Sequence, residues 1–151
     1  MVSQPTHFYT PAEYLALERE ADHKSEYLAG EIFALAGASE AHNTITLNFA
    51  AALHAQLRGR PCRVFANDLR VRVQASGLYT YPDVLALCGE RRFEDAHRDT
   101  LLNPTLIGEV LSPSTEAYDR GKQFGHYRRL ESLIDYLLIA QDEVRVEHYT
   151  R

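Results

Sequence analysis

Cysteine is scarce in this chain. Its 151 residues include two cysteines, Cys62 and Cys88, which lie far apart and form no C-x-x-C pair. This spacing predicts neither a zinc knuckle nor a disulfide framework. A domain of this length buries roughly 68–70% of its unfolded surface, so its core is large enough to fold without disulfides or metal ions.

Long apolar runs and targeting segments are also lacking. No apolar stretch approaches the ~18 residues of a membrane span, and residues 1–8 have neither the basic nor the apolar region of a signal peptide. The chain contains no repeat, low-complexity tract or linker. We therefore expect a single domain over residues 1–151, without membrane contact and in a reducing, cytoplasmic compartment.

Lysine is rare, whereas arginine is common. Lys24 and Lys122 are the two lysines among 16 basic residues, so a lysine here suggests a need for a compact ammonium group. The net charge of −5 argues mildly against nucleic acid as a partner. Locally, however, five arginines between Arg58 and Arg72 accompany one acid, Asp68, so this segment is either a phosphate-binding track or a solvated strand face.

The hydrophobic content of 45% and the charged content of 25% are typical of one globular domain, and the residue pattern predicts an α/β fold. The expected elements are a helix over residues 10–21, a β-hairpin over 26–35, a long helix over 39–58, strands over 63–73, 79–88 and 104–111, a helix from 115 or 119, a strand over 135–140 and an edge strand over 144–149. The order after residue 38 is therefore α-β-β-β-α-β. A hairpin that pairs Val73 with Tyr79 would place Asp68 on the opposite side of the sheet from Asp83.

Two carboxylates lie in apolar surroundings. Asp83 precedes the run Val84 to Leu87, and Glu109 interrupts the apolar strand 104–111. An unpaired buried charge costs several kcal/mol, so such groups are normally paired, protonated or bound to a metal. If the two strands are adjacent, the carboxylates should approach within about 6 Å and, with a main-chain carbonyl and water, could hold magnesium. Without metal, at least one of them should have a raised pKa. The alternative is an ordinary pair of acids at the rim of the sheet.

Lys122 is the candidate cation for the same site. It follows Glu109 on a helix that must fold back over the strand, where an ammonium would stabilise negative charge on a water molecule or a phosphate. Gly121 and Gly125 flank it one turn apart and predict a close approach to that helix. Its nitrogen is then expected within roughly 4–6 Å of the carboxylates. The alternative is an exposed helix lysine.

The remaining candidates are weaker. His42 shares a helix face with Ile45 and Phe49, so it is either a core histidine or a member of the site. Glu26 and Glu31 are expected at exposed hairpin positions.

Several segments taken together carry a family resemblance. They are Tyr81-Pro82-Asp83, residues 109–115, residues 119–122, Tyr127, and the stretches 38–43 and 67–71. This combination resembles the Uma-type endonuclease family of the PD-(D/E)XK restriction-endonuclease-like superfamily, and it spans nearly the whole chain. The resemblance implies an α/β fold with a mixed central sheet, preceded by an N-terminal helix and a hairpin.

The resemblance also implies an activity. A protein of this family would be a magnesium-dependent endonuclease that hydrolyses DNA phosphodiester bonds, with manganese as a substitute ion. Asp83 and Glu109 would hold the ion, Lys122 would orient the attacking water, and His42 would be a further catalytic residue. The superfamily expects a lysine two residues after the acid, where this chain has Leu111, so the resemblance implies that the lysine has moved to Lys122. It also implies a further hairpin past Arg151, so we expect this chain to be truncated.

Two other functions are compatible with the same sequence. One is a degraded site on the same fold, which would bind nucleic acid through residues 58–72 without cutting it. The other is a homo-oligomer, such as a dimer, that pairs through the edge strand 144–149. Metal-dependent plasmid nicking and the mass in solution distinguish these functions.

Overall fold

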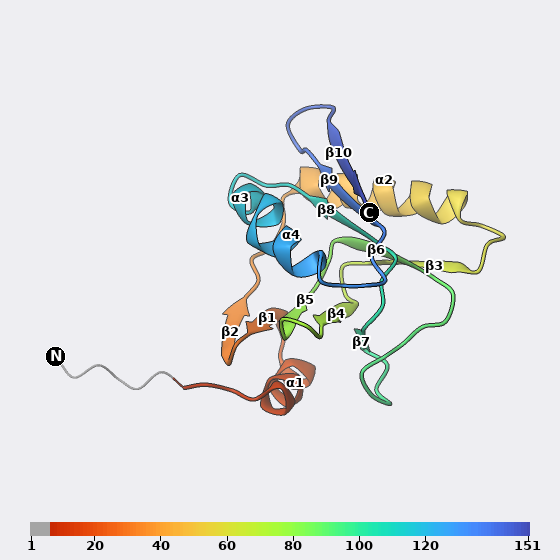
Figure 1. The fold of residues 1–151 in the computed structure, drawn as a ribbon. Helices are drawn as coiled ribbons and strands as arrows, with labels where there is room; N and C mark the ends of the chain where they lie inside the picture. Colours follow the sequence, from red (N-terminus) through yellow and green to blue (C-terminus); the bar gives the residue numbers. More distant parts are fainter. Residues whose placement is uncertain (1–6) are drawn as a thin grey trace.

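The computed structural model describes residues 7–151, so part of the segment analysed for a targeting signal lies outside the described residues. Figure 1 labels the elements along the chain. They are α1 (Pro11–Glu20), β1 (Ser25–Leu28), β2 (Glu31–Ala34), α2 (Glu40–Gln56), β3 (Cys62–Ala66), β4 (Arg70–Val73), β5 (Leu78–Thr80), β6 (Val84–Cys88), β7 (Thr100–Leu101), β8 (Leu106–Val110), α3 (Glu116–Arg120), α4 (Lys122–Tyr127), β9 (Asp135–Ile139) and β10 (Val146–Thr150). In this part of the chain, no helix is long and apolar enough to cross a membrane.

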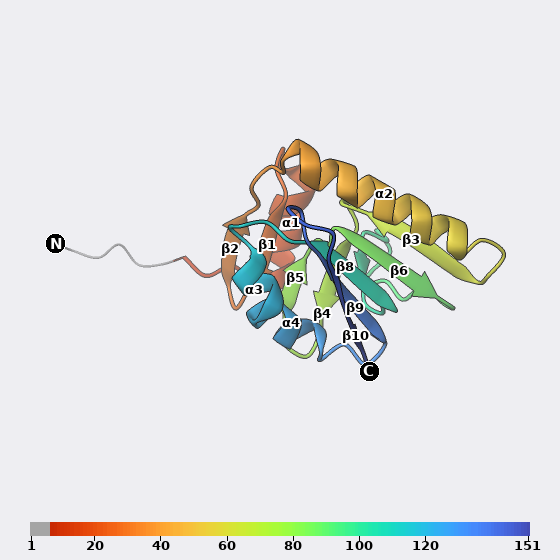
Figure 2. The same cartoon turned by 90° about the horizontal axis from the view of Figure 1, so that it is seen from above.

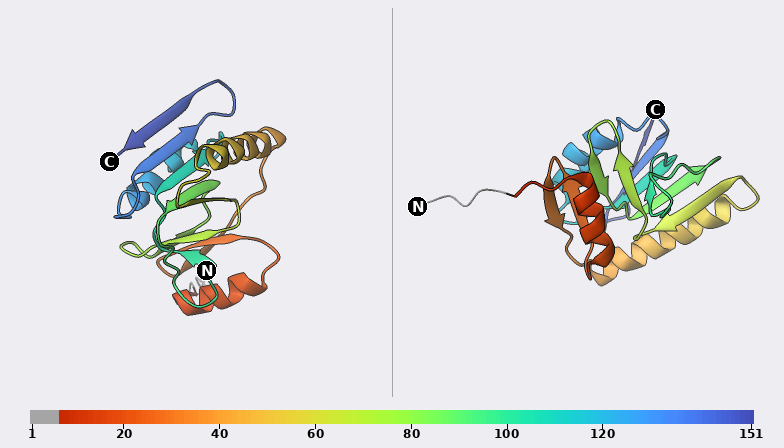
Figure 3. Two further views of the ribbon diagram at one scale, coloured as in Figure 1. Left: turned by 90° about the vertical axis from the view of Figure 1, so that its right-hand side faces the viewer. Right: turned by 90° about the horizontal axis from the view of Figure 1, so that it is seen from below.

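The strands form two mixed sheets. The first has the order β2-β1-β5-β4-β7, and the second has the order β10-β9-β8-β6-β3. Helix α1 contributes Tyr14 and Leu15 to a small cluster with Tyr27 and Tyr79 of the first sheet. Helix α2 contacts β3, β6 and β8 of the second sheet, and Figure 2 shows it lying along β3. Figure 3 shows α1 and α2 on different sides of the molecule.

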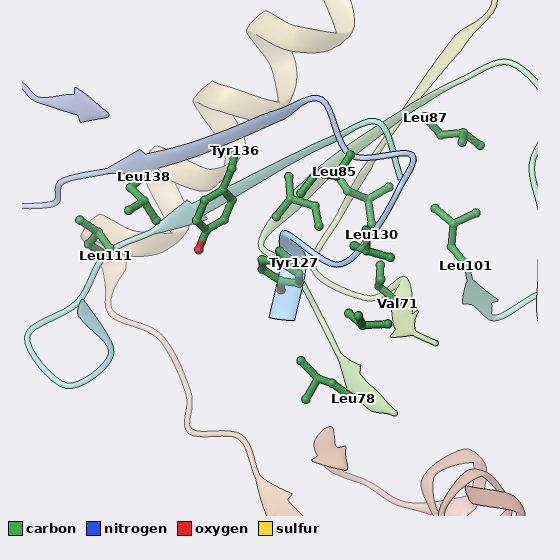
Figure 4. Close-up of a cluster of buried hydrophobic side chains, with 13 residues drawn as sticks. Val71, Leu78, Leu85, Leu87, Leu101, Leu111, Tyr127, Leu130, Tyr136 and Leu138 are labelled. Carbon is green, nitrogen blue, oxygen red and sulfur yellow. The ribbon is translucent and has the colours of Figure 1, made fainter. Parts of the chain in front are cut away.

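The main core lies between the two sheets and α4. It contains Val71 and Leu78 from the first sheet, Leu85 and Ile107 from the second, and Tyr127 from α4, all buried. Figure 4 labels Val71, Leu78, Leu85 and Tyr127 of this core. Burial of each such side chain stabilises the fold by roughly 1.5–3 kcal/mol. Because this core joins both sheets, it fixes the position of β6 and β8, which carry the two acids.

A close approach of α2 to β8 depends on Gly108. A Cβ atom at this position would lie 2.5 Å from the Phe49 ring, so a larger residue would require the ring to move or α2 to shift. The absence of a side chain here lets α2 pack closely on the sheet, with its N-terminal end beside the start of β6. This contact is what brings His42 to Asp83.

Two of the expected long strands are each divided. Residues 63–73, expected as one strand, form β3 in the second sheet and β4 in the first, and residues 79–88 form β5 and β6 in the same way. Asn67, with φ of 64°, turns the chain between β3 and β4 in the left-handed region, which asparagine tolerates. The expected register is also wrong by one residue, because Val73 pairs with Leu78 rather than with Tyr79.

The expected helix after residue 115 is broken as well. Gly121 ends α3 and begins α4 with φ of −104° and ψ of −98°, so two short helices replace one. Gly125 has no atom within 4 Å of its missing side chain, so the expected close approach at this residue is wrong.

The expectation of unbonded cysteines is wrong. Cys62 and Cys88 form a disulfide, because antiparallel pairing of β3 with β6 places them directly opposite each other. Their distance in the sequence gives no sign of this pairing, since it arises only when α2 and the β4–β5 hairpin bring the two strands together.

Candidate functional site

Asp83 and Glu109 lie side by side, as expected. The antiparallel register of β6 and β8 pairs Val84 with Gly108, which places Asp83 next to Glu109. The Val110 N–H donates to Asp83 Oδ2 at 2.8 Å, and the Asp83 N–H donates to Glu109 Oε2 at 3.4 Å. Each carboxylate is thus held by the backbone of the other strand. The expected juxtaposition of the two acids is confirmed.

Glu109 is buried and hydrogen bonded from the opposite side by α4. The Tyr127 hydroxyl donates to Glu109 Oε1 at 3.0 Å, and the Gln123 amide donates to the tyrosine oxygen at 3.1 Å. Burial raises the pKa of Glu109 well above its ordinary value, and the negative charges of Asp83 and Asp119 raise it further. The expectation of a raised pKa in this pair is therefore confirmed. A group of converging acids of this kind is stabilised by a cation.

His42 belongs to the same site. Ser39 caps α2, and its hydroxyl accepts from the His42 N–H at 3.1 Å, which fixes the first turn of the helix. His42 Nε2 then lies 3.2 Å from Asp83 Oδ2, and both side chains are mostly buried. Its Nδ1 is 3.4 Å from the Thr46 hydroxyl. Of the two alternatives for His42, the structure favours membership of the site.

A cavity of about 520 Å³ opens beside these residues. Four carboxylates line it, those of Glu26, Asp83, Glu109 and Asp119. Among the described residues, Lys24 is the one lysine or arginine in its lining. The cavity therefore combines an excess of negative charge with a single ammonium group, which suits a divalent cation together with a phosphate.

The structure does not bring Lys122 to the carboxylates. This side chain is exposed and does not line the cavity, whereas the next residue, Gln123, is buried and does. The chain breaks at Gly121, where a new helix begins, and this break decides which side chains of α4 face the cavity. The expected migration of the lysine onto this helix therefore has no geometric support.

Lys24, and not Lys122, is the lysine that lines the cavity. Its Nζ donates to the Asn67 carbonyl at 3.0 Å, lies 3.2 Å from Asp68 Oδ1, and sits 5.3 Å from the centre of the Tyr81 ring. An ammonium group has three N–H donors, so one remains for a ligand in the cavity. The scarcity of lysine in the sequence was the available signal, although it did not distinguish Lys24 from Lys122.

Sequence patterns also failed to identify Glu26 and Asp119 as part of the cavity. Glu26 was expected at an exposed hairpin position, but burial raises its pKa to about 7. Asp119 is buried near the start of the broken helix, and burial raises its pKa to about 7, with added repulsion from Asp83 and Glu26. Alternation along β1 does not reveal this, because α3 covers the position only in the folded chain.

The buried carboxyl of Glu26 predicts a pH dependence of stability. Its pKa rises from 4.5 to about 7 on folding, so the folded protein keeps a proton that the unfolded chain loses over this range. The stabilisation is complete below about pH 4.5 and is lost as the pH rises through about 7. Thermal unfolding followed by circular dichroism should therefore show a shallower decline with pH for Glu26→Gln than for the wild type. Glu31→Gln, the same change at an exposed position of the same hairpin, should match the wild type.

The arginine-rich segment is divided between core and surface. Arg70 is buried, with its Nε donating to the Thr100 hydroxyl at 2.9 Å and its guanidinium 3.1 Å from Asp99. Arg72 is half-buried and paired with Glu94. These two side chains are therefore not part of a surface track, because they pair with Asp99 and Glu94 of the segment between β6 and β7. Arg58, Arg60 and Arg63 are exposed.

The carboxylates fit a hard, partly hydrated cation. Magnesium needs one or two carboxylates and completes its shell with water, which Asp83 and Glu109 allow. Within residues 7–151, no three side chains of the His, Cys, Asp or Glu type are placed to hold a metal by themselves. A structural zinc site, which takes four protein ligands, does not fit this arrangement.

Comparison with known proteins gives consistent results. The family model Uma2, described as "Putative restriction endonuclease", matches residues 11–151. The uncharacterised protein sll1609 of Synechocystis sp. (strain ATCC 27184 / PCC 6803 / Kazusa) is 42% identical over 151 residues, which are 100% of this chain and 85% of the relative. A second uncharacterised protein of that organism, slr1290, is 37% identical over 147 residues, covering 97% of this chain and 76% of the relative.

A solved structure shares the fold. It is a crystal structure of a "putative nuclease belonging to DUF820" from Anabaena variabilis ATCC 29413, with a TM-score of 0.72 and 21% sequence identity. The match covers 93% of this chain and 83% of the other. The expected α/β fold of the restriction-endonuclease-like type is confirmed.

Proposed function

Since this chain belongs to the Uma2 family of restriction-endonuclease-like nucleases, we propose that it is a magnesium-dependent endonuclease that hydrolyses DNA phosphodiester bonds. The observation that carries the proposal is the pairing of Asp83 with Glu109 at the cavity, each bonded to the backbone of the other strand. Manganese is the expected substitute ion.

In this proposal Asp83 and Glu109 hold the ion. When bound, a divalent cation would lower the pKa of a water molecule and offset the charge on the scissile phosphate. Tyr127 fixes the orientation of Glu109 by donating to Oε1. His42 fixes Asp83 through Oδ2, so that neither acid has to reorient when the ion binds.

Lys24 supplies the positive charge in place of Lys122. Two of its N–H donors are held by Asn67, which lines the cavity, and by the exposed Asp68, so the third would be available to an anion in the cavity. An ammonium at this point would bind a phosphate oxygen and stabilise the charge that develops during attack. Glu26 and Asp119, which line the same cavity, would then help to draw cations into it.

The test of this function is nicking of supercoiled plasmid DNA. We expect conversion to open circles in magnesium or manganese and none in a chelator. The second candidate is a degraded site that binds DNA without cutting it, which the exposed position of Lys122 favours. Salt-dependent binding of DNA without nicking in either metal would establish that candidate instead.

Self-association is a separate proposal. Strand β10 forms one edge of the second sheet, and its Val146 and Tyr149 side chains are 58% and 42% exposed. An unpaired edge of this kind can pair with a second copy. Light scattering that gives the mass of one chain would exclude a dimer.

A further inference from the structure

A second hollow lies at the opposite end of the strands that carry the site. This groove has a volume of about 460 Å³ and is lined by the end of α2, by β3 and by the loop after β6. Its charged and titratable lining residues are His54, Arg60, Arg63 and Arg91, and none of its lining residues is acidic. The groove is thus cationic in a protein whose net charge is −5.

The arginines of the groove are not used by the fold. Arg60, Arg63 and Arg91 are exposed, and none of them forms a salt bridge or a side-chain hydrogen bond with another residue of the range 7–151. By contrast, Arg19 and Arg70 are paired with carboxylates. Guanidinium groups without internal partners are available for an external anion, and their planar donors match phosphate oxygens.

The distance between the groove and the acids follows from the elements that join them. His42 at one end of α2 contacts Asp83, and His54 near the other end lines the groove; the twelve-residue interval corresponds to about 18 Å of helix. Along β6, the path from Asp83 to Gly89 is roughly 20 Å. Both paths give the same separation, as expected if helix and strand run alongside each other (Figure 2).

This separation matches a stretch of double-stranded DNA. Successive phosphates of one strand are about 3.4 Å apart along the axis, so roughly 18 Å spans about five base pairs. We propose that the groove lined by Arg60, Arg63 and Arg91 binds the phosphate backbone of duplex DNA about five base pairs from the cavity that contains Asp83 and Glu109. This inference rests on the proposed nuclease function and names the surface that positions its substrate.

The contacts would be to phosphates and not to bases. Arginines on a shallow, open groove fix the orientation of a duplex without reading its sequence. Each phosphate that is neutralised releases condensed counterions, which contributes about 0.9 to the slope of log K against log salt. The proposal therefore predicts that removal of these arginines weakens binding to a similar extent for every DNA sequence.

The test compares two double variants with equal charge. Arg63→Ala/Arg91→Ala removes one cation from β3 and one from the loop after β6, and Arg128→Ala/Arg129→Ala removes two exposed cations after α4 that do not line the groove. Binding of a fluorescent 20-base-pair duplex (about four times the proposed separation) is measured by anisotropy in a chelator, so that cleavage plays no part. Circular dichroism checks the fold of each variant.

We expect the groove variant to lower the salt slope by about 2 and to weaken the binding of unrelated sequences equally, while the control variant keeps the wild-type slope. Equal slopes for wild type and groove variant, or no binding by the wild type, would overturn the proposal. So would loss of inorganic phosphate binding in the groove variant with duplex binding unchanged, since it would show a small-anion site. Plasmid nicking is measured separately. If the wild type nicks DNA but the groove variant keeps the wild-type salt slope, DNA binding by the groove is refuted and the nuclease function is not. If the groove variant has a lower salt slope but the wild type does not nick DNA, the nuclease function is refuted and DNA binding by the groove is not.

Discussion

Replacement of Asp83 by asparagine is expected to reduce magnesium-dependent plasmid nicking by roughly 100-fold or more. Asparagine keeps the shape of the side chain and an oxygen that can accept from the Val110 N–H, but it lacks the negative charge that holds a cation. Loss of a group that merely orients a metal ligand already costs 10–100-fold in metal affinity or activity, so loss of a ligand should cost at least as much. The change should also weaken binding of manganese, measured by calorimetry.

A matched control separates the site from general charge effects. Asp142→Asn makes the same chemical change at an exposed position that lies outside the cavity lining. It should nick plasmid and bind manganese like the wild type. Nicking by Asp83→Asn at the wild-type rate would show that the paired acids are not the metal site, even if the protein proves to be a nuclease.

The two lysines should differ sharply in their effect on nicking. Lys24→Ala removes the ammonium that lines the cavity, and we expect a fall in rate of roughly 100–1,000-fold, the range found when one group that stabilises developing negative charge is removed. Lys122→Ala removes an exposed side chain and should leave the rate within about twofold of the wild type. Both variants lose one positive charge, so any effect of net charge is the same.

Rates at saturating and limiting DNA distinguish two roles for Lys24. Loss of a contact made only in the transition state lowers the maximal rate, whereas loss of a contact that is equally strong in the ground and transition states raises only the half-saturating DNA concentration. The opposite ranking, with Lys122→Ala inactive and Lys24→Ala active, would restore the helix lysine as the functional cation. If both variants nick normally, neither ammonium group takes part.

The pairing of Asp83 with Glu109 could be predicted from the sequence. Both acids interrupt apolar strands, and a carboxylate in such a place needs a partner. Their burial pattern alone indicated adjacent central strands, and the antiparallel register of β6 and β8 satisfies that expectation. The family resemblance favoured His42, whose helix face left its role ambiguous, whereas the contact of Tyr127 with Glu109 emerged only from the structure.

The sequence did not identify Lys24 as the cation that lines the cavity. Lys24 precedes β1, and Lys122 follows the helix break, so both were plausible by composition. The choice depends on which side of α4 faces the sheet, and this phase is set by the backbone at Gly121. A helical pattern that assumes one continuous helix from residue 115 therefore predicts the wrong buried face for α4.

Local patterns thus determined α1, α2, most of the strand segments and the two acids, because these depend on side-chain periodicity and on the cost of burying a charge. Tertiary structure alone decided which strands belong to which sheet, since β3 and β4 have the same alternation but separate at Asn67. It also decided the Cys62–Cys88 disulfide, the burial of Glu26 and the place of Lys24 in the cavity. Each of these depends on contacts between residues distant in the sequence, which no local pattern encodes.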